Sequence, residues 1–218
     1  MRKGSNKPKP NPKPASLRDR LRLLQRDAVL DVACELFLAR GYRATTTALI
    51  AEKAEIGVAT VFRYFRSKEG VLAALSRRDL DKILSLARTA AAAPTDDPAK
   101  TLLEVCARVL EMHRMPSTQI RGQTRIWLLI PSGHRETDEV VISSDREFRE
   151  IIHDLLKHYR RCGRIERRHD LSDMTMLIFA VFYHHYLSIA LNRSTKIEQV
   201  VNELRRRIPL LISGWTTG

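Results

Sequence analysis

The sequence predicts an all-α protein, and three observations support this. Leu, Ala, Arg and Glu dominate the 218 residues, while runs of Val, Ile and Thr with a period of two are scarce. Apolar residues instead recur at spacings of three and four, which is the period of an amphipathic helix. Pro and Gly lie for the most part between these segments, so they separate consecutive helices.

The size and the net charge of the chain limit the classes of function that it can have. Hydrophobic residues make up 44% of the chain, enough for a sizeable core, and the length suits one large or two small domains. The net charge is +13, of which +8 lies in residues 1–70. A balance this basic indicates a polyanionic partner, either nucleic acid or an acidic membrane surface. No membrane partner is expected, because the basic residues do not form one amphipathic face.

Cysteine usage and the N-terminus bear on the compartment. Cys34, Cys106 and Cys162 are far apart and odd in number, with neither disulfide-framework nor zinc spacing. Buried or incidental thiols in a reducing compartment are favoured over a redox sensor. The first 16 residues lack the apolar stretch of a secretory signal, so a cytoplasmic location is expected.

Residues 1–16 are expected to form a disordered basic tail, because Lys and Pro alternate there and no apolar area can be buried. Two interpretations stay open: a solvated tail, or an arm that follows nucleic-acid phosphates or enters a minor groove. The first helix is predicted over 26–39, and Gly41 ends it. Its apolar face consists of Val29, Val32, Ala33, Leu36 and Phe37.

Two short helices joined by a tight turn follow. Thr45 or Thr46 caps a helix over 47–54, residues 55–57 form the turn, and the second short helix covers 58–64. This second helix is basic and aromatic, which is the layout of a helix-turn-helix DNA reader. The small core that fixes the angle between the two helices is expected to consist of Ile50, Ala51, Ala54, Ile56, Val61 and Phe65.

The rest of the chain is predicted to be helical as well. A long helix begins at Ser67, and Pro209 is expected to kink the last helix. The apolar segment 174–191 is only marginally long enough to cross a bilayer and contains two histidines, so burial against another subunit is expected instead. The predicted helices cover 67–92, 98–115, 117–130, 136–161, 171–191 and 195–214.

With these elements in place, the chain resembles the TetR family of bacterial transcriptional regulators over roughly residues 26–72. The resemblance implies a three-helix helix-turn-helix DNA-binding domain over 17–66. It also implies a helical regulatory, ligand-binding and dimerisation domain over 67–218. The matching positions are Gly41-Tyr42, Thr45-Thr46, Ile50-Ala51-Glu52, Ala54, Ile56, Thr60, Val61-Phe62, Tyr64-Phe65 and Ser67-Lys68-Glu69.

The expected DNA contacts lie on and around the second short helix. Arg63 is the best base reader, since a guanidinium can bridge two acceptors of guanine, although a contact to phosphate alone is equally open. Lys68 and the helix start at Ser67 are expected to hold a phosphate. Glu55, Gly57 and Val58 depart from the family pattern, so the DNA sequence preference is expected to be the chain's own. The full set is Thr46, Thr47, Val58, Ala59, Thr60, Phe62, Arg63, Tyr64 and Lys68.

The remaining sites follow from the resemblance. The last two helices are implied to form a dimer surface, as a four-helix bundle across a twofold axis. It consists of Phe182, Tyr186, Ile189, Val200, Val201, Leu204, Ile208 and Leu211. A hydrophobic or aromatic small-molecule effector is expected in a pocket lined by Cys106, Leu110, His113, Arg125, Trp127, Leu128, Phe179, Tyr183 and His184. No metal or cofactor is expected, since His184 and His185 point about 100° apart on a helix.

The sequence therefore predicts a DNA-binding transcriptional repressor that binds a palindromic operator as a homodimer and is released by a small molecule. The alternative is a ligand-independent architectural or nucleoid protein, which the basic tail would also suit. An enzyme is not expected, because no phosphate loop, nucleophile elbow, zinc-protease motif or dinucleotide fingerprint is present.

Overall fold

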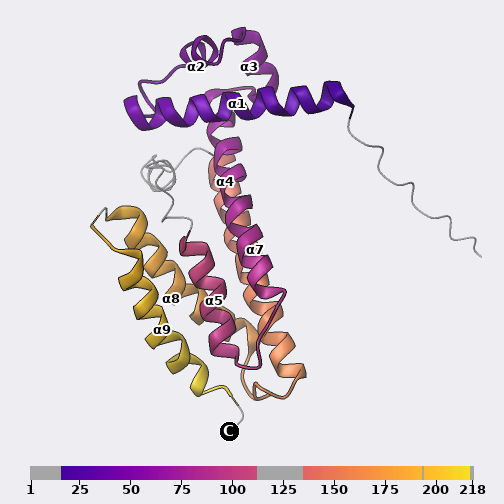
Figure 1. Ribbon diagram of the computed structural model, residues 1–218, viewed down its shortest axis with the longest axis vertical. Coiled ribbons are helices and arrows are strands. Elements are labelled where there is room, and N and C mark those ends of the chain that lie inside the picture. The colour runs from indigo at the N-terminus through magenta and orange to yellow at the C-terminus, as the bar shows by residue number, and fades with distance from the viewer. Residues whose placement is uncertain (1–15, 112–134, 193, 217–218) are drawn as a thin grey trace, which may run out of the picture.

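The computed structural model describes residues 16–111, 135–192 and 194–216, and within these ranges the chain is helical, as predicted (Figure 1). A single antiparallel bridge, between Ile165 and Thr216, is the extent of β-pairing there. The predicted helix over 117–130 lies outside the described residues. The helices are α1 (Leu17–Arg40), α2 (Thr47–Lys53), α3 (Val58–Phe65), α4 (Lys68–Ala91), α5 (Pro98–Glu111), α7 (Arg135–Arg161), α8 (Leu171–Leu191) and α9 (Ile197–Ser213).

Helix α1 begins nine residues before the predicted start at Arg26, so that boundary was wrong. Its start is a capping box: the Ser16 hydroxyl accepts from the Asp19 N–H at 3.1 Å, and the Asp19 carboxylate accepts from the Ser16 N–H at 3.3 Å. Every side chain from Leu17 to Gln25 is exposed. The added turns bury no apolar face, which is why helical periodicity did not reveal them.

Helices α1, α2 and α3 form one small unit with its own core. α1 lies across the top of the molecule, and α2 and α3 pack above it (Figure 1). Four of the six predicted core residues, Ile50, Ala51, Val61 and Phe65, are buried, while Ala54 and Ile56 are half-buried against them. The cluster is completed by Val29, Leu30, Ala33, Cys34, Leu36, Phe37, Val71, Leu72 and Leu75.

Helix α4 belongs to two cores. Its first turns contribute Val71, Leu72 and Leu75 to the core of the α1–α3 unit. Further along, Ile83 and Leu84 enter the second, larger core, formed with α5, α7, α8 and α9. The eight helical steps from Leu75 to Ile83 rise about 12 Å. One rigid element therefore connects the two packed bodies.

Ion pairs fix α4 to its neighbours. Arg77 and Arg88 on α4 both pair with Glu147 on α7, at 2.9 and 2.6 Å. Hydrogen bonding to Arg77 lowers the pKa of the Glu147 carboxyl below its usual range. On the other side, Arg78 pairs with Asp31 on α1 at 2.8 Å. Helix α4 is therefore paired with α7 on one side and with α1 on the other.

Helices α8 and α9 cover one side of the second core (Figure 1). Pro209 lies inside α9, as predicted, and the helix continues to Ser213. In the described ranges, no helix combines the length and the apolarity that crossing a bilayer requires. The apolar α8 instead buries one side among the other helices, including Met174, Ile178 and Phe182.

Candidate nucleic-acid interface and cavity

The outward face of α3 is short, apolar at its start and basic at its end. Val61 and Phe65 face the core, whereas Val58, Ala59, Phe62 and Arg63 are exposed. The exposed positions follow the i, i+1, i+4, i+5 spacing of one helix face. This face is free to approach another molecule, with a methyl-rich start and a guanidinium in the last turn.

The turn before α3 adopts a conformation that is unusual for its residues. Glu55 has a φ of 54°, which lies in the left-handed region of the backbone map. Glycine adopts this conformation without strain, whereas for other residues it costs about 1–2 kcal/mol. Gly57 is the N-cap residue and has no side chain to bond the first turn. The Thr60 N–H donates to the Gly57 carbonyl at 2.8 Å, so the Val58 and Ala59 N–H groups are the ones that face an external acceptor such as a phosphate. Thr60, in this turn, is half-buried.

Three of the expected DNA contacts already bond within the protein. Thr46 caps α2, its hydroxyl accepting from the Leu49 N–H at 3.1 Å, while Thr47 is half-buried beside it. The Tyr64 hydroxyl donates to the Gln25 side chain at 2.7 Å and so links α3 to α1. These bonds fix the orientation of the two short helices.

Lys68 is the third. Its ammonium donates to the Tyr42 carbonyl at 2.9 Å and lies 4.3 Å from the centre of the Tyr42 ring. Burial lowers the pKa of this ammonium. A second N–H donates to the Arg43 carbonyl at 3.5 Å. The side chain thus holds the loop after α1 against the start of α4, and one of its three N–H groups remains to reach a phosphate.

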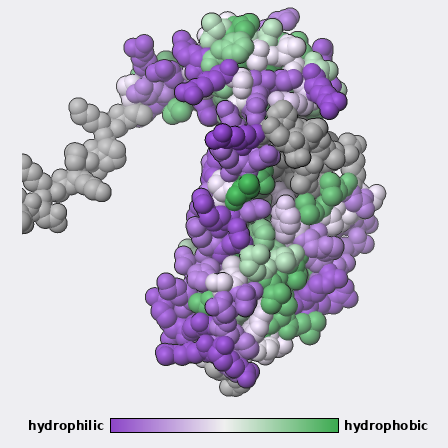
Figure 2. All heavy atoms as spheres, turned by 180° about the vertical axis from the view of Figure 1, so that it is seen from behind, coloured by the Kyte–Doolittle hydropathy of each residue, from purple (hydrophilic) through white to green (hydrophobic). Residues whose placement is uncertain are grey.

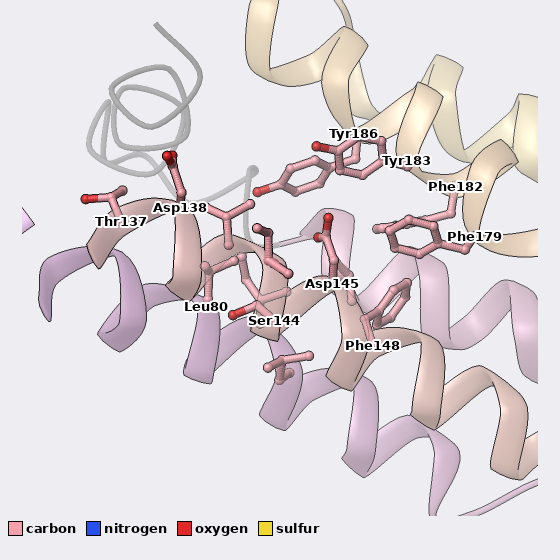
Figure 3. Close-up of a pocket in the computed structure, with 15 residues that line it drawn as sticks. Leu80, Thr137, Asp138, Ser144, Asp145, Phe148, Phe179, Phe182, Tyr183 and Tyr186 are labelled. Carbon is pink, nitrogen blue, oxygen red and sulfur yellow. The ribbon is translucent and has the colours of Figure 1, made fainter. Parts of the chain in front are cut away.

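A second feature, a cavity of about 350 Å³, borders the larger core and is partly open to the surface (Figure 3). Its walls come from α4, α5, α7 and α8, and five aromatic side chains contribute to them. The lining residues are Leu80, Ile83, Leu84, Val109, Thr137, Asp138, Val141, Ile142, Ser144, Asp145, Phe148, Phe179, Phe182, Tyr183 and Tyr186. A volume of this size suits a small organic molecule.

The cavity includes part of the predicted ligand site. Of the nine predicted residues, Phe179 and Tyr183 line it. Cys106 and Leu110 are buried in the core without lining the cavity, and His184 is exposed. Burial raises the pKa of the Cys106 thiol to about 12, so this cysteine is a packed, unreactive thiol. The other four, His113, Arg125, Trp127 and Leu128, lie outside the described residues.

Helix α7 supplies most of the lining that sequence reasoning missed. Thr137, Val141, Ser144, Asp145 and Phe148 recur at spacings of three and four, one face of the helix. The polar members of this face concealed the pattern. A polar group on an otherwise core-facing stripe was the signal that could have indicated a cavity.

Asp145 and Tyr183 are the cavity groups whose pKa values are shifted. Loss of solvent raises the pKa of the Asp145 carboxyl above the usual range, although nearby Arg149 opposes this shift. Burial, followed by the charge of Asp145, raises the pKa of the Tyr183 hydroxyl. Figure 3 shows the Asp145 carboxylate pointing from α7 toward Tyr183 and Tyr186 on α8. The carboxylate and the two phenol rings therefore share one side of the cavity.

The predicted dimer surface needs a correction too. Phe182, Ile189, Val200, Leu204 and Ile208 are buried in the core of this chain, where they cannot meet a second copy. Phe182 and half-buried Tyr186 line the cavity instead. Of the eight predicted residues, Val201 and Leu211 are half-buried and do not line the cavity.

A different stripe of α8 is apolar and exposed. Leu177, which is 49% exposed, is followed along the helix by exposed Ala180, His184 and Leu191. Leu210 on α9 is 74% exposed. Figure 2 shows hydrophobic side chains gathered over this side of the molecule.

In the described part of the chain, no group of three or more His, Cys, Asp or Glu side chains could hold a metal ion.

Comparison with known proteins agrees with this layout. Residues 29–75 match the family model for bacterial regulatory proteins of the tetR family. The uncharacterized HTH-type transcriptional regulator YvkB of Bacillus subtilis (strain 168) is 31% identical over 162 residues, which cover 72% of this chain and 80% of that protein.

Solved structures share the fold at low sequence identity. The complex of SmeT from Stenotrophomonas maltophilia with triclosan has a TM-score of 0.72 at 17% identity, covering 89% of this chain and 92% of SmeT. FadR of Bacillus subtilis in complex with stearoyl-CoA has a TM-score of 0.68 at 17% identity, covering 86% and 98%. The chain belongs to the TetR family and is a DNA-binding transcriptional regulator.

Proposed function

We propose that this protein is a repressor that binds a palindromic operator as a homodimer and leaves it when a small molecule enters the cavity. The observation that carries the proposal is the double role of α4. The same helix contributes Leu72 and Leu75 to the core beneath α3, and Leu80 and Ile83 to the cavity wall.

On DNA, the exposed face of α3 enters a major groove. Val58 and Ala59 are placed to touch thymine methyl groups, and Arg63 to read a guanine. Phe62 packs against sugar or methyl groups, since it lacks a hydroxyl for a phosphate. The N–H groups after Gly57 and the remaining N–H of Lys68 bind the phosphate backbone. Thr46, Thr47 and Thr60 lie beside them.

Dimerisation uses the exposed stripe of α8, with Leu210 on α9 beside it. Exposed leucines in a helical stripe are the features that a second copy would bury, and a twofold axis makes the two surfaces identical. The resulting pair presents two copies of α3. Each copy adds one half-site, so the operator is palindromic.

The effector acts by differential affinity. In one conformation of the dimer, the spacing of the two α3 helices does not allow both to reach successive major grooves. A ligand that binds this conformation more tightly lowers operator affinity by linkage. The route is short, because the Glu136 N–H on α7 donates to the Glu69 carboxylate at 3.4 Å, next to the cavity residue Thr137. Glu69 lies in the first turn of α4, immediately after α3.

Similar folds support this reading by analogy. SmeT is the repressor of the Stenotrophomonas maltophilia multidrug efflux pump SmeDEF and is seen bound to triclosan. FadR is seen bound to stearoyl-CoA. At this level of identity they support the idea of an internal effector site and leave its chemistry open.

Selection of bound sequences from a random DNA library with the full chain tests the proposal. Two symmetric half-sites about one helical turn apart, or a small multiple of it, are the expected result. Anisotropy titration of the selected operator should then show twofold stoichiometry. A selected site without symmetry, or binding by a single copy, would contradict the homodimeric repressor.

The alternative is a ligand-independent architectural protein, which the net charge of +13 favours. Footprinting across the genome separates the two functions. Few palindromic sites beside an operon indicate the repressor, whereas many dispersed sites without a shared sequence indicate the architectural role.

A further inference from the structure

The cavity differs from the rest of the molecule in its charge. The chain carries 38 Lys and Arg residues against 25 Asp and Glu, yet the charged side chains lining the cavity in the described residues are both acidic, Asp138 and Asp145. Asp138 is exposed in the first turn of α7, and Asp145 lies two turns further along the same helix, partly buried. An anionic ligand would meet two like charges here.

The Asp145 carboxylate forms no close ion pair among the residues that the structure describes, although the charge of Arg149 acts on it from a greater distance. Arg149, the nearest candidate on its own helix, makes no ion pair with it. The Arg149 guanidinium lies 5.6 Å from the centre of the Phe179 ring, with Nη1 3.5 Å from the Met176 sulfur. A partly desolvated carboxylate without a partner is costly, and a neutral apolar ligand would desolvate it further.

The walls around Asp145 are suited to a cation. Phe179 and Tyr183 stack with ring centres 5.4 Å apart, and Tyr183 and Tyr186 are near-parallel with centres 6.3 Å apart. Phe148 and Phe182 close the end of the cavity, 4.7 Å apart. Aromatic faces attract a cation within about 6 Å, most strongly where water is excluded.

Thr137 adds an independent observation. It is 4% exposed, lines the cavity, and its hydroxyl oxygen has no hydrogen-bond partner within the described ranges. A buried hydroxyl without a partner is uncommon in a folded protein. A ligand carrying N–H groups could donate to it.

We propose that the cavity takes a hydrophobic cation, an amine or quaternary ammonium group on an aromatic or aliphatic body, with its positive charge between Asp145 and the Tyr183 and Tyr186 rings. The proposal rests on the proposed function, in which this cavity is the effector site, and names the chemical class of the effector. The same two carboxylates disfavour a ligand that places a carboxylate in this part of the cavity.

Three probes of similar shape test the class by calorimetric titration of the full chain. They are naphthylmethyl-trimethylammonium, its neutral isostere neopentylnaphthalene, and the anion naphthylacetate. The cation should bind about tenfold more tightly than the isostere, or better, and naphthylacetate should bind most weakly. Equal or tighter binding of the neutral or anionic probe would overturn the proposal, and so would failure of all three to bind.

Two Asp→Asn variants test whether the positive charge of the ligand lies beside Asp145. Asp145→Asn should remove most of the preference for the cation while leaving the affinity for neopentylnaphthalene within about twofold. Asp154→Asn makes the same change at an exposed position of the same helix, outside the cavity, and should alter neither affinity. An unchanged preference in Asp145→Asn would contradict the assignment. The comparison of probes on the unmodified chain stands even if this variant does not fold.

The effect on DNA is measured separately, so the two failures can be told apart. If the cation is preferred but does not weaken operator binding, the assigned ligand class stands and release by this ligand is wrong. If the neutral or anionic probe is preferred and weakens operator binding, the repressor function stands and the ligand class is wrong.

Discussion

Arg63 is the side chain on α3 that is best suited to distinguish one base from another. It is exposed in the last turn, and its guanidinium lies 5.3 Å from the centre of the neighbouring Tyr64 ring. That stacking leaves the planar fork of N–H donors free to face outward. Since α3 is only eight residues long, its whole outer face can approach a groove.

Replacing Arg63 with Ala should relax the base preference at one symmetric pair of operator positions, by about 1–3 kcal/mol for the preferred base. The measurement is a repeat of the library selection with the variant. A uniform loss of affinity on all sequences, together with a smaller salt dependence, would show that Arg63 contacts phosphate only.

The raised pKa of Asp145 predicts how cation binding depends on pH. The groups facing this carboxyl are Arg149 and Asp138 on its own helix and Tyr183 on α8. A cation requires the ionised form, so affinity should be constant well above the pKa and fall as the pH is lowered through it. Because desolvation raises that pKa, the fall should begin at a higher pH than for an exposed Asp. A quaternary ammonium probe does not titrate, and Asp145→Asn should give a flat profile.

At the scale of elements, the sequence predicted helix existence better than helix orientation. The bounds of α8 agree with prediction, because Asp170 caps its start and the apolar run is continuous. Which side of α8 faces its own core could not be predicted, since apolar residues surround the helix. Phe182 and Ile189 were therefore placed on the dimer surface and prove to be internal, whereas Leu177 is exposed.

The start of α1 and the cavity face of α7 were missed for related reasons. Hydrophobic periodicity detects a helix that buries an apolar stripe, and Leu17 to Gln25 bury none. The capping box at Ser16 and Asp19 was the available signal. On α7 the stripe includes Asp145 and Thr137, which look like solvent-facing residues until a cavity gives them a role.

The junction between α3 and α4 depends on Gly70. A Cβ added there would lie 1.9 Å from the Phe65 carbonyl oxygen, which belongs to the backbone and cannot move aside. Gly70→Ala should lower the free energy of unfolding by about 1–3 kcal/mol, despite the better helix propensity of Ala. Urea unfolding at fixed protein concentration measures this.

Gly57→Ala is the matched control for that variant. A Cβ at Gly57 meets nothing within 4 Å, and its φ of −69° suits any residue. Gly57→Ala should change the free energy of unfolding by less than Gly70→Ala does. The change should be about 1 kcal/mol at most, because Ala is the weaker N-cap residue. Equal destabilisation by both substitutions would show that the close approach at Gly70 is unimportant.

For the whole molecule, the arrangement of two cores on one helix has a simple consequence. Among the described residues, α4 and the start of α7 connect the α1–α3 unit to the cavity, so a signal that follows these contacts moves α4. The Arg77 and Arg88 pairs with Glu147 couple α4 to α7 over a long stretch. These exposed pairs hold register more than they add stability.

The dimer surface can be tested at the same scale. Leu177→Glu places a charge in the exposed stripe of α8 and should shift sedimentation from dimer to monomer, with a matching loss of operator affinity. Leu23→Glu makes the same change on α1, at a similarly exposed position, and should leave the dimer intact. A dimeric Leu177 variant would place the interface elsewhere.

The exposed beginning of α1 implies that the backbone amides of one continuous helix are protected from hydrogen exchange to two different degrees. Isolated helices this short are marginal in water. Within the part of the chain that the structure describes, the Ser16 cap and the Gln25–Tyr64 bond support the exposed segment from Leu17 to Gln25. Backbone amides there should exchange with deuterium orders of magnitude faster than those from Val29 to Phe37, which are anchored in the core. Operator DNA should slow the exchange of this segment if its arginines lie along the phosphates, and uniform protection from the start would show a helix rigid before it meets DNA.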